Sequence, residues 1–114
     1  MAVSTPDDIV AIRADVVSGM GWQQLGGMPH VRVKELWSSQ RAVAGLLRID
    51  PHAREVAHLH SHGQHHLWVL DGHVEINGIG LPEGSYVHVP AGALHALTNR
   101  GEQACTLGFV FLPA

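Results

Sequence analysis

The histidines are the residues of this chain whose type and spacing point to chemistry. His58 and His60 are separated by one residue, and positions two apart on a β-strand share a face, so both imidazoles can point to one place. His65 follows shortly after them, and His95 lies in a second run further along the chain. Three or four imidazoles that converge from neighbouring strands form a site for a divalent metal ion. The sequence therefore predicts a metal site in this part of the chain.

Short strands must position these histidines. From residue 31 onward, apolar runs alternate with turn sequences such as Asp71-Gly72 and Asn77-Gly78. We expect strands over residues 31–36, 41–49, 55–60, 65–70, 73–76, 84–89, 94–98 and 105–112. The connections are too short for helices, so the pattern predicts an all-β domain of antiparallel strands, arranged as a sandwich or barrel.

The first thirty residues carry weaker signals. They allow a short helix from Pro6 to Arg13, and several glycines and Pro29 then interrupt any long element. We therefore divide the chain into an irregular N-terminal arm, residues 1–30, and a β domain, residues 31–114.

The composition sets limits on the partners of the protein. A chain of 114 residues with 46% hydrophobic and 15% charged residues forms one core. The net charge of -3 comes without a basic block, so we do not expect nucleic acid as a partner. The chain has no apolar run long enough for a membrane span and no signal-like start, and we expect a cytoplasmic protein. The single cysteine, Cys105, lies in an apolar stretch and is interpreted as a packed thiol.

The two histidine runs resemble the two motifs of the cupin superfamily, which are small jelly-roll β-barrels. The second run matches every fixed position of its motif, namely Gly84, Pro90, Gly92, His95 and Asn99. The first run matches at His58, His60 and Gly72 and departs at two positions. His52 replaces a leading glycine, and His65 replaces the glutamate that the family usually supplies as a ligand.

The resemblance implies a single-domain cupin-type jelly-roll β-barrel or sandwich with one divalent transition metal per chain. The implied ligands are His58, His60, His65 and His95, and the candidate ions are Fe, Mn, Ni, Cu and Zn, with Fe or Mn favoured. Gln64 or His66 could replace His65 if the loop shifts by one residue, although strand alternation points His66 to the opposite face. Four neutral imidazoles leave the full charge on the ion, which favours an anionic ligand or an enolate.

Other side chains are candidates for the surroundings of the ion. His88 is either an interior residue able to hydrogen-bond substrate or an outward-facing one, and Tyr86 is either a proton donor or a packing residue. These two residues are the catalytic candidates. His62 is expected to face solvent, with a gating role as the alternative. The apolar residues that share faces with the histidines form either a pocket lining or ordinary barrel core: Leu67, Val69, Leu97, Leu107, Phe109 and Phe111. The three tryptophans either wall a pocket or make a dimer contact: Trp22, Trp37 and Trp68.

The resemblance implies a metal-dependent cupin enzyme, with a dioxygenase or related oxidoreductase favoured. Its substrate would be a small carbonyl or carboxylate compound, an organic anion that chelates through oxygen. A non-redox isomerase or lyase is an alternative within the enzyme class. The stretch Val31–Trp37 looks like the opening of cupins attached to anti-sigma factors, so a non-catalytic metal- or ligand-sensing module is the second interpretation. A closed structural zinc site is the third. A homodimer is expected by analogy with cupins that pair their sheets.

Overall fold

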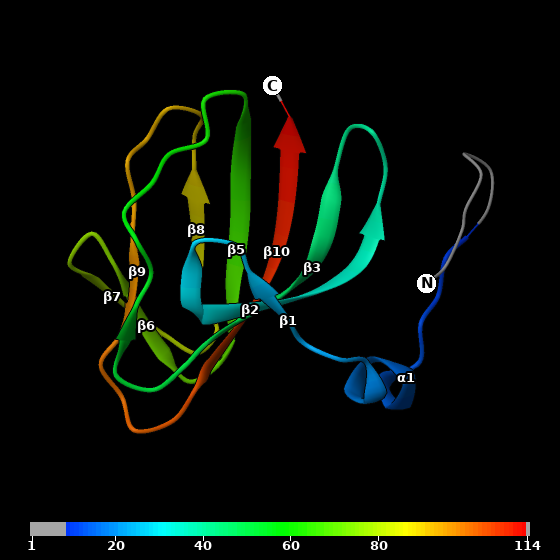
Figure 1. Ribbon diagram of the computed structural model, residues 1–114, viewed down its shortest axis with the longest axis horizontal. Coiled ribbons are helices and arrows are strands. Elements are labelled where there is room, and N and C mark those ends of the chain that lie inside the picture. Colours follow the sequence, from blue (N-terminus) through cyan, green and yellow to red (C-terminus); the bar gives the residue numbers. More distant parts are fainter. Residues whose placement is uncertain (1–8, 114) are drawn as a thin grey trace.

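Two antiparallel sheets face each other in the computed structural model, which describes residues 9–113 (Figure 1). The larger sheet contains, in spatial order, β1 (Gln23–Leu25), β2 (Met28–Ser38), β3 (Val43–Ile49), β10 (Cys105–Pro113), β5 (Gly63–Asp71) and β8 (Tyr86–Val89). The smaller sheet contains β4 (Ala53–Arg54), β9 (Leu97–Asn99), β6 (His73–Ile76) and β7 (Ile79–Pro82). The expected all-β cupin-type architecture is confirmed, as an open sandwich whose sheets do not close into a barrel.

The strands differ from the expected ranges mainly at the histidine runs. Residues 55–60 do not form a continuous strand, because pairing stops after Arg54 and resumes only at an isolated bridge between His58 and His95. The run expected over 94–98 is likewise reduced to β9. The strands β1 and β7 were not expected from the sequence.

The N-terminal helix lies later in the chain than the sequence suggested. Residues 9–13 are not helical, the residues before them lie outside the described part, and the helix α1 spans Ala14–Gly19. The β-branched residues Ile9, Val10 and Ile12 favour an extended chain, and the last two line a surface depression with Leu36 and Trp37. Residues 23–25 and 28–30, assigned to the irregular arm, belong to the larger sheet. No helix in the described part of the chain is long and apolar enough to cross a membrane.

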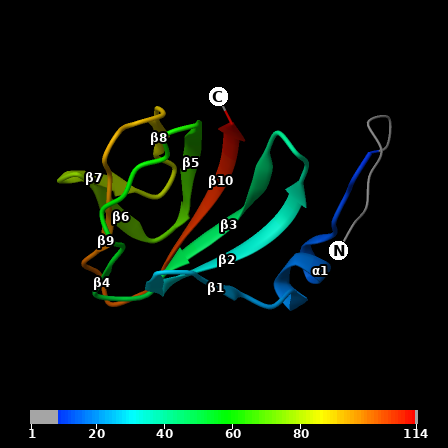
Figure 2. The same cartoon turned by 45° about the horizontal axis from the view of Figure 1, so that its top comes forward.

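A buried lysine holds the helix against the larger sheet. Lys34 on β2 is only 6% exposed, and its Nζ donates a hydrogen bond of 2.8 Å to the carbonyl oxygen of Val17. The same ammonium lies 4.7 Å from the ring centroid of Trp22. Figure 2 shows α1 beside β1 and β2, far from the smaller sheet. Trp22 is thus a packing partner of Lys34.

The core lies between the two sheets. Its side chains come from both of them, and Cys105 is among those fully buried. Burial, with a smaller effect from Asp71, raises the pKa of the Cys105 thiol to about 11. The interpretation of Cys105 as a packed thiol is confirmed.

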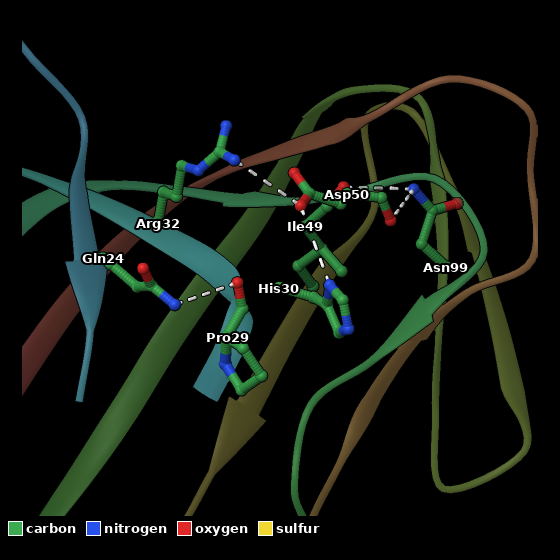
Figure 3. A network of polar contacts seen from close by, with 7 residues as sticks. All are labelled: Gln24, Pro29, His30, Arg32, Ile49, Asp50 and Asn99. Atoms are coloured by element: carbon green, nitrogen blue, oxygen red, sulfur yellow. Dashed lines mark hydrogen bonds and ion pairs between the residues drawn. The ribbon is translucent and has the colours of Figure 1, made fainter. Parts of the chain in front are cut away.

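The asparagine of the second motif joins the two sheets. Asn99 is buried, and its Nδ2 donates to the carbonyl oxygens of Ile49 and Asp50, at 3.2 Å each (Figure 3). It also donates to the carbonyl oxygen of Gln103 at 2.8 Å. A buried amide of this kind is stable only when its donors are satisfied. Asn99 therefore connects the end of β3 to β9 and has a structural role away from the histidines.

Candidate metal centre

A β-bulge brings the first histidine to the inside of the sandwich. Across β4 and β9, Arg54 faces Thr98, and the Glu55 N–H then donates to Leu97 O at 2.8 Å. The next pair, His58 and His95, is offset by one residue, so Val56 and Ala57 together face one residue of the other strand. Both bulge residues are exposed. The extra residue resets the alternation, so that Glu55 and His58 both face the interior.

Three histidines form a compact group of ligand atoms. One nitrogen from each of His58, His60 and His95 lies within 4.8 Å of the others. The ring centroids of His58 and His95 are 4.3 Å apart, and that of His60 is 5.0 Å from the first and 5.6 Å from the second. Nitrogens at this spacing can share one ion with bonds of about 2 Å.

Two of these histidines are held in one tautomer by the backbone. His58 Nδ1 is 2.7 Å from Val56 O, and His95 Nδ1 is 3.0 Å from Ala93 O. Because a carbonyl oxygen only accepts, each Nδ1 carries the proton and each Nε2 keeps its lone pair free. The carbonyl that orients His58 belongs to the bulge, so one local irregularity both turns this histidine inward and sets its protonated nitrogen.

The third histidine has a buried nitrogen with no partner. Within residues 9–113, His60 Nε2 is the one enclosed side-chain polar atom that lacks a hydrogen bond. Burial and the neighbouring His58 and His95 lower the pKa of His60, and burial also lowers that of His95. Neutral imidazoles with free lone pairs are what a divalent ion requires, so this donor set fits a metal.

The fourth expected ligand, His65, lies beside this group. It projects inward from β5, with its ring centroid 4.5 Å from that of His60 and 6.4 Å from that of His95. Phe109 and Phe111 border its ring at 5.9 and 4.9 Å. Burial, followed by the adjacent His60, lowers the pKa of His65 to about 4. The four expected ligands therefore share one cavity, with three of them in the tight group.

The cavity is small and mostly apolar. Its volume is about 330 Å³, and it lies between the two sheets. Leu25, Gly26 and Met28, from the β1–β2 hairpin, form part of its wall. The remaining lining residues come from strands of both sheets and from the segments beside β4 and β9: Val33, Leu47, Glu55, His58, His60, His65, Leu67, Ile76, His95, Leu97 and Phe109. The region divided off as an irregular arm thus contributes to the site.

Glu55 is a site residue that the sequence did not indicate. It is 4% exposed and lines the cavity. Burial raises its pKa, and this effect is partly offset by His58 and by the N–H of Leu97. Strict alternation along an unbroken strand would have put Glu55 on the face opposite to His58. Only the bulge places the two on the same side.

The two catalytic candidates lie on the opposite face of the larger sheet. Tyr86 is 48% exposed, and its hydroxyl is 2.6 Å from His66 Nδ1. His88 is exposed as well, with Nε2 2.6 Å from Gln64 Oε1. Neither Tyr86 nor His88 lines the cavity, because inward positions on β8 alternate with theirs and are occupied by Val87 and Val89.

The remaining candidate site residues lie on the same outer face or in turns. His66 and Gln64, the substitutes considered for His65, lie with Trp68 on the outer face, as alternation predicted for His66. His62 is exposed in the turn before β5. His52, at the expected leading glycine, has a φ of 56°, in the left-handed region that favours glycine. The departure from the motif therefore preserves the backbone conformation.

The model of the ChrR cupin-like domain family matches residues 14–113, so the chain belongs to this family of cupins. The resemblance to the cupin superfamily is thereby confirmed. No curated protein matches the chain.

Solved cupin structures share the fold. The polyketide cyclase RemF from Streptomyces resistomycificus has a TM-score of 0.79 and 16% identity, covering 93% of this chain and 80% of its own. A predicted oxalate decarboxylase from Thermotoga maritima has a TM-score of 0.78 and 17% identity, covering 92% and 100%. The cupin domain of Schizosaccharomyces pombe Cnp3 has a TM-score of 0.74 and 17% identity, covering 86% and 72%. At these identities the likeness concerns the fold alone.

Proposed function

We propose that this protein is a metal-dependent cupin enzyme that binds a small oxygen-bearing organic anion at a divalent ion. The ion would be held by His58, His60 and His95, with His65 as the fourth ligand. One observation carries the proposal: the enclosed, partnerless Nε2 of His60 lies beside two histidines whose Nδ1 atoms face backbone carbonyls. An unpartnered polar atom inside a protein is costly, and an ion would remove that cost.

The protein's own residues perform three tasks in this proposal. Val56 O and Ala93 O orient two imidazoles, and burial keeps the histidines neutral. The rings of Phe109 and Phe111 shield His65 from water. A bound divalent ion would supply Lewis acidity and a template for oxygen ligands.

The cavity suggests the class of ligand. The cavity lining is apolar, and the described residues that form it include no arginine or lysine, so phosphates are disfavoured. A set of neutral imidazoles leaves the charge of the ion uncompensated by its ligands, which favours an anion that chelates through oxygen. Two fold neighbours are named as a polyketide cyclase and a predicted oxalate decarboxylase, so the fold hosts activities on oxygen-bearing molecules. We favour oxygen-dependent chemistry with Fe or Mn, as in a dioxygenase.

The test begins with metal content. Untagged wild-type protein and the variants H60A and H95A are loaded with Fe(II), Mn(II) or Zn(II), and bound metal is measured by elemental analysis. We expect one ion per chain in the wild type and loss of occupancy in both variants. Exposed His62, replaced by alanine, is the matched control and should retain its ion. Full occupancy in H60A and H95A contradicts the assignment.

Activity is then tested on the loaded protein. Metal-loaded and metal-free wild type are titrated with β-diketones and α-hydroxy acids, and oxygen uptake is recorded with Fe(II). Metal-dependent binding together with oxygen consumption supports a dioxygenase. Binding without turnover supports a ligand-sensing module, or a non-redox isomerase or lyase, in place of a dioxygenase.

A further inference from the structure

Glu55 lines the cavity but does not belong to the group of candidate metal ligands. Among the described residues that line the cavity, it is the one polar side chain that is not a histidine. It is also outside the set of ligand atoms that His58, His60 and His95 bring within 4.8 Å of one another. A carboxylate beside a metal group, but not part of it, is placed to contact a ligand bound there.

The two carboxylate oxygens of Glu55 differ in their contacts: Oε1 accepts a backbone hydrogen bond and Oε2 faces the cavity. Oε1 accepts the N–H of Leu97 at 3.1 Å, which is the sole hydrogen bond of this carboxylate within residues 9–113. Oε2 has no hydrogen-bond partner within residues 9–113. Among these residues, the one side-chain polar atom that is both fully enclosed and without a hydrogen bond is His60 Nε2, so Oε2 is not fully enclosed. Oε2 therefore keeps contact with the space of the cavity.

We propose that Oε2 of Glu55 is the second recognition point of the cavity and accepts a hydrogen bond from a hydroxyl on the bound organic anion. This inference rests on the proposed function and narrows its substrate class to anions that carry a hydroxyl group close to the chelating oxygens, such as α-hydroxy acids. Glu55 is 4% exposed, so Oε2 meets little solvent, and a ligand hydroxyl would supply the hydrogen bond that it lacks in the described part of the chain.

The hydrogen bond from the N–H of Leu97 fixes which way an amide would point at position 55. In E55Q, the N–H of Leu97 needs an acceptor, so the amide oxygen must take the place of Oε1. The amide NH₂ then points to the cavity and presents donors where the wild type presents an acceptor. The variant keeps the volume and the contact with Leu97, so a purely structural role of Glu55 leaves ligand preference unchanged.

The experiment compares ligands of similar size that differ in one group. Protein loaded with one Zn(II) per chain, an ion without redox chemistry, is titrated calorimetrically with mandelate and with α-methoxyphenylacetate. Mandelate carries a hydroxyl donor, and the methyl ether has none. We expect wild type to bind mandelate about tenfold more tightly, the effect of one charge-assisted hydrogen bond. In E55Q this preference should disappear or reverse, while zinc content stays at one per chain.

Controls separate the possible failures. E83Q removes an exposed carboxylate in a turn and should keep the wild-type preference. An unchanged preference for mandelate in E55Q overturns the inference and leaves the proposed function standing. Equal affinities of wild type for the two compounds also overturn it, and this outcome needs no variant to fold. If loaded wild type binds neither compound, nor any of the β-diketones, the proposed function fails and the inference with it.

Discussion

His58 and His95 exchange both backbone hydrogen bonds across an isolated bridge, with N···O distances of 3.0 and 2.9 Å. Their ring centroids lie 4.3 Å apart on the cavity side of this bridge. The two motifs of the chain are thus joined at their histidines by the backbone itself. The relative position of two candidate ligands depends on main-chain pairing that begins one residue out of register with β4 and β9.

The first prediction concerns this offset. Deletion of Ala57, an exposed bulge residue, should weaken metal binding about 10- to 100-fold although every histidine is retained. Without the extra residue, pairing continues in one register and His58 stays on the inward face opposite His95, but Val56 becomes its direct neighbour and its carbonyl no longer lies two residues away to accept from Nδ1. The measurement is a metal titration, with circular dichroism to verify folding. A57S keeps the chain length and should bind as wild type; wild-type affinity in the deletion variant would show that the bulge is dispensable.

The second prediction concerns His65. H65E should keep one ion per chain, because glutamate is the usual cupin ligand at this position and fits the same inward site on β5. It should weaken the binding of organic anions, since the carboxylate cancels one charge on the ion. Metal content and ligand titration measure the two effects separately. H66A, on the outer face, is the control; loss of metal in both H65E and H66A would point to His66 as the ligand.

The third prediction is a dependence of stability on pH in metal-free protein. The pKa of His65 is about 4 in the folded state, against 6.5 as its ordinary value, so below pH 6.5 the unfolded state binds the proton more readily. The contribution of His65 to the free energy of unfolding is therefore fully present above pH 6.5, and it is lost as the pH falls from 6.5 toward 4. Urea unfolding at several pH values should show the decline. The free energy of unfolding of H65L should decline less steeply with falling pH. Identical pH dependences for H65L and wild type would contradict the lowered pKa of His65.

The fourth prediction concerns the aromatic wall. A Cβ at Gly63 would overlap the ring of Phe111, which lies 4.9 Å from the ring of His65 and 5.3 Å from that of His60. G63A should therefore displace Phe111, lower the free energy of unfolding by about 1–3 kcal/mol and weaken metal binding. Chemical denaturation and metal titration measure these effects. G21A, where a Cβ meets nothing within 4 Å, should change neither property.

Several features of the site could be predicted from local sequence. The separation of His65 from His66 onto opposite faces follows from the period of two along an extended chain, and β5 is regular over both residues. The left-handed turn at Gly72, with a φ of 88°, is likewise indicated by the residue type alone. The motif positions of His58, His60 and His95 could also be recognised from the sequence, because residue type and spacing are local properties.

Other features depended on which strands pair and in what register. Glu55 and His58 share the cavity only because Val56 and Ala57 bulge against the segment that carries His95, and no pattern within residues 55–60 reveals a partner so distant in the chain. Tyr86 and His88 face outward because β8 joins the sheet beside β5, with His88 opposite His66. The sequence by itself determined the histidine set and the class of fold, since these rest on residue types and short-range periodicity. The tertiary structure alone decided which carboxylate joins the cavity, because register is set by pairing between segments that are far apart in the chain.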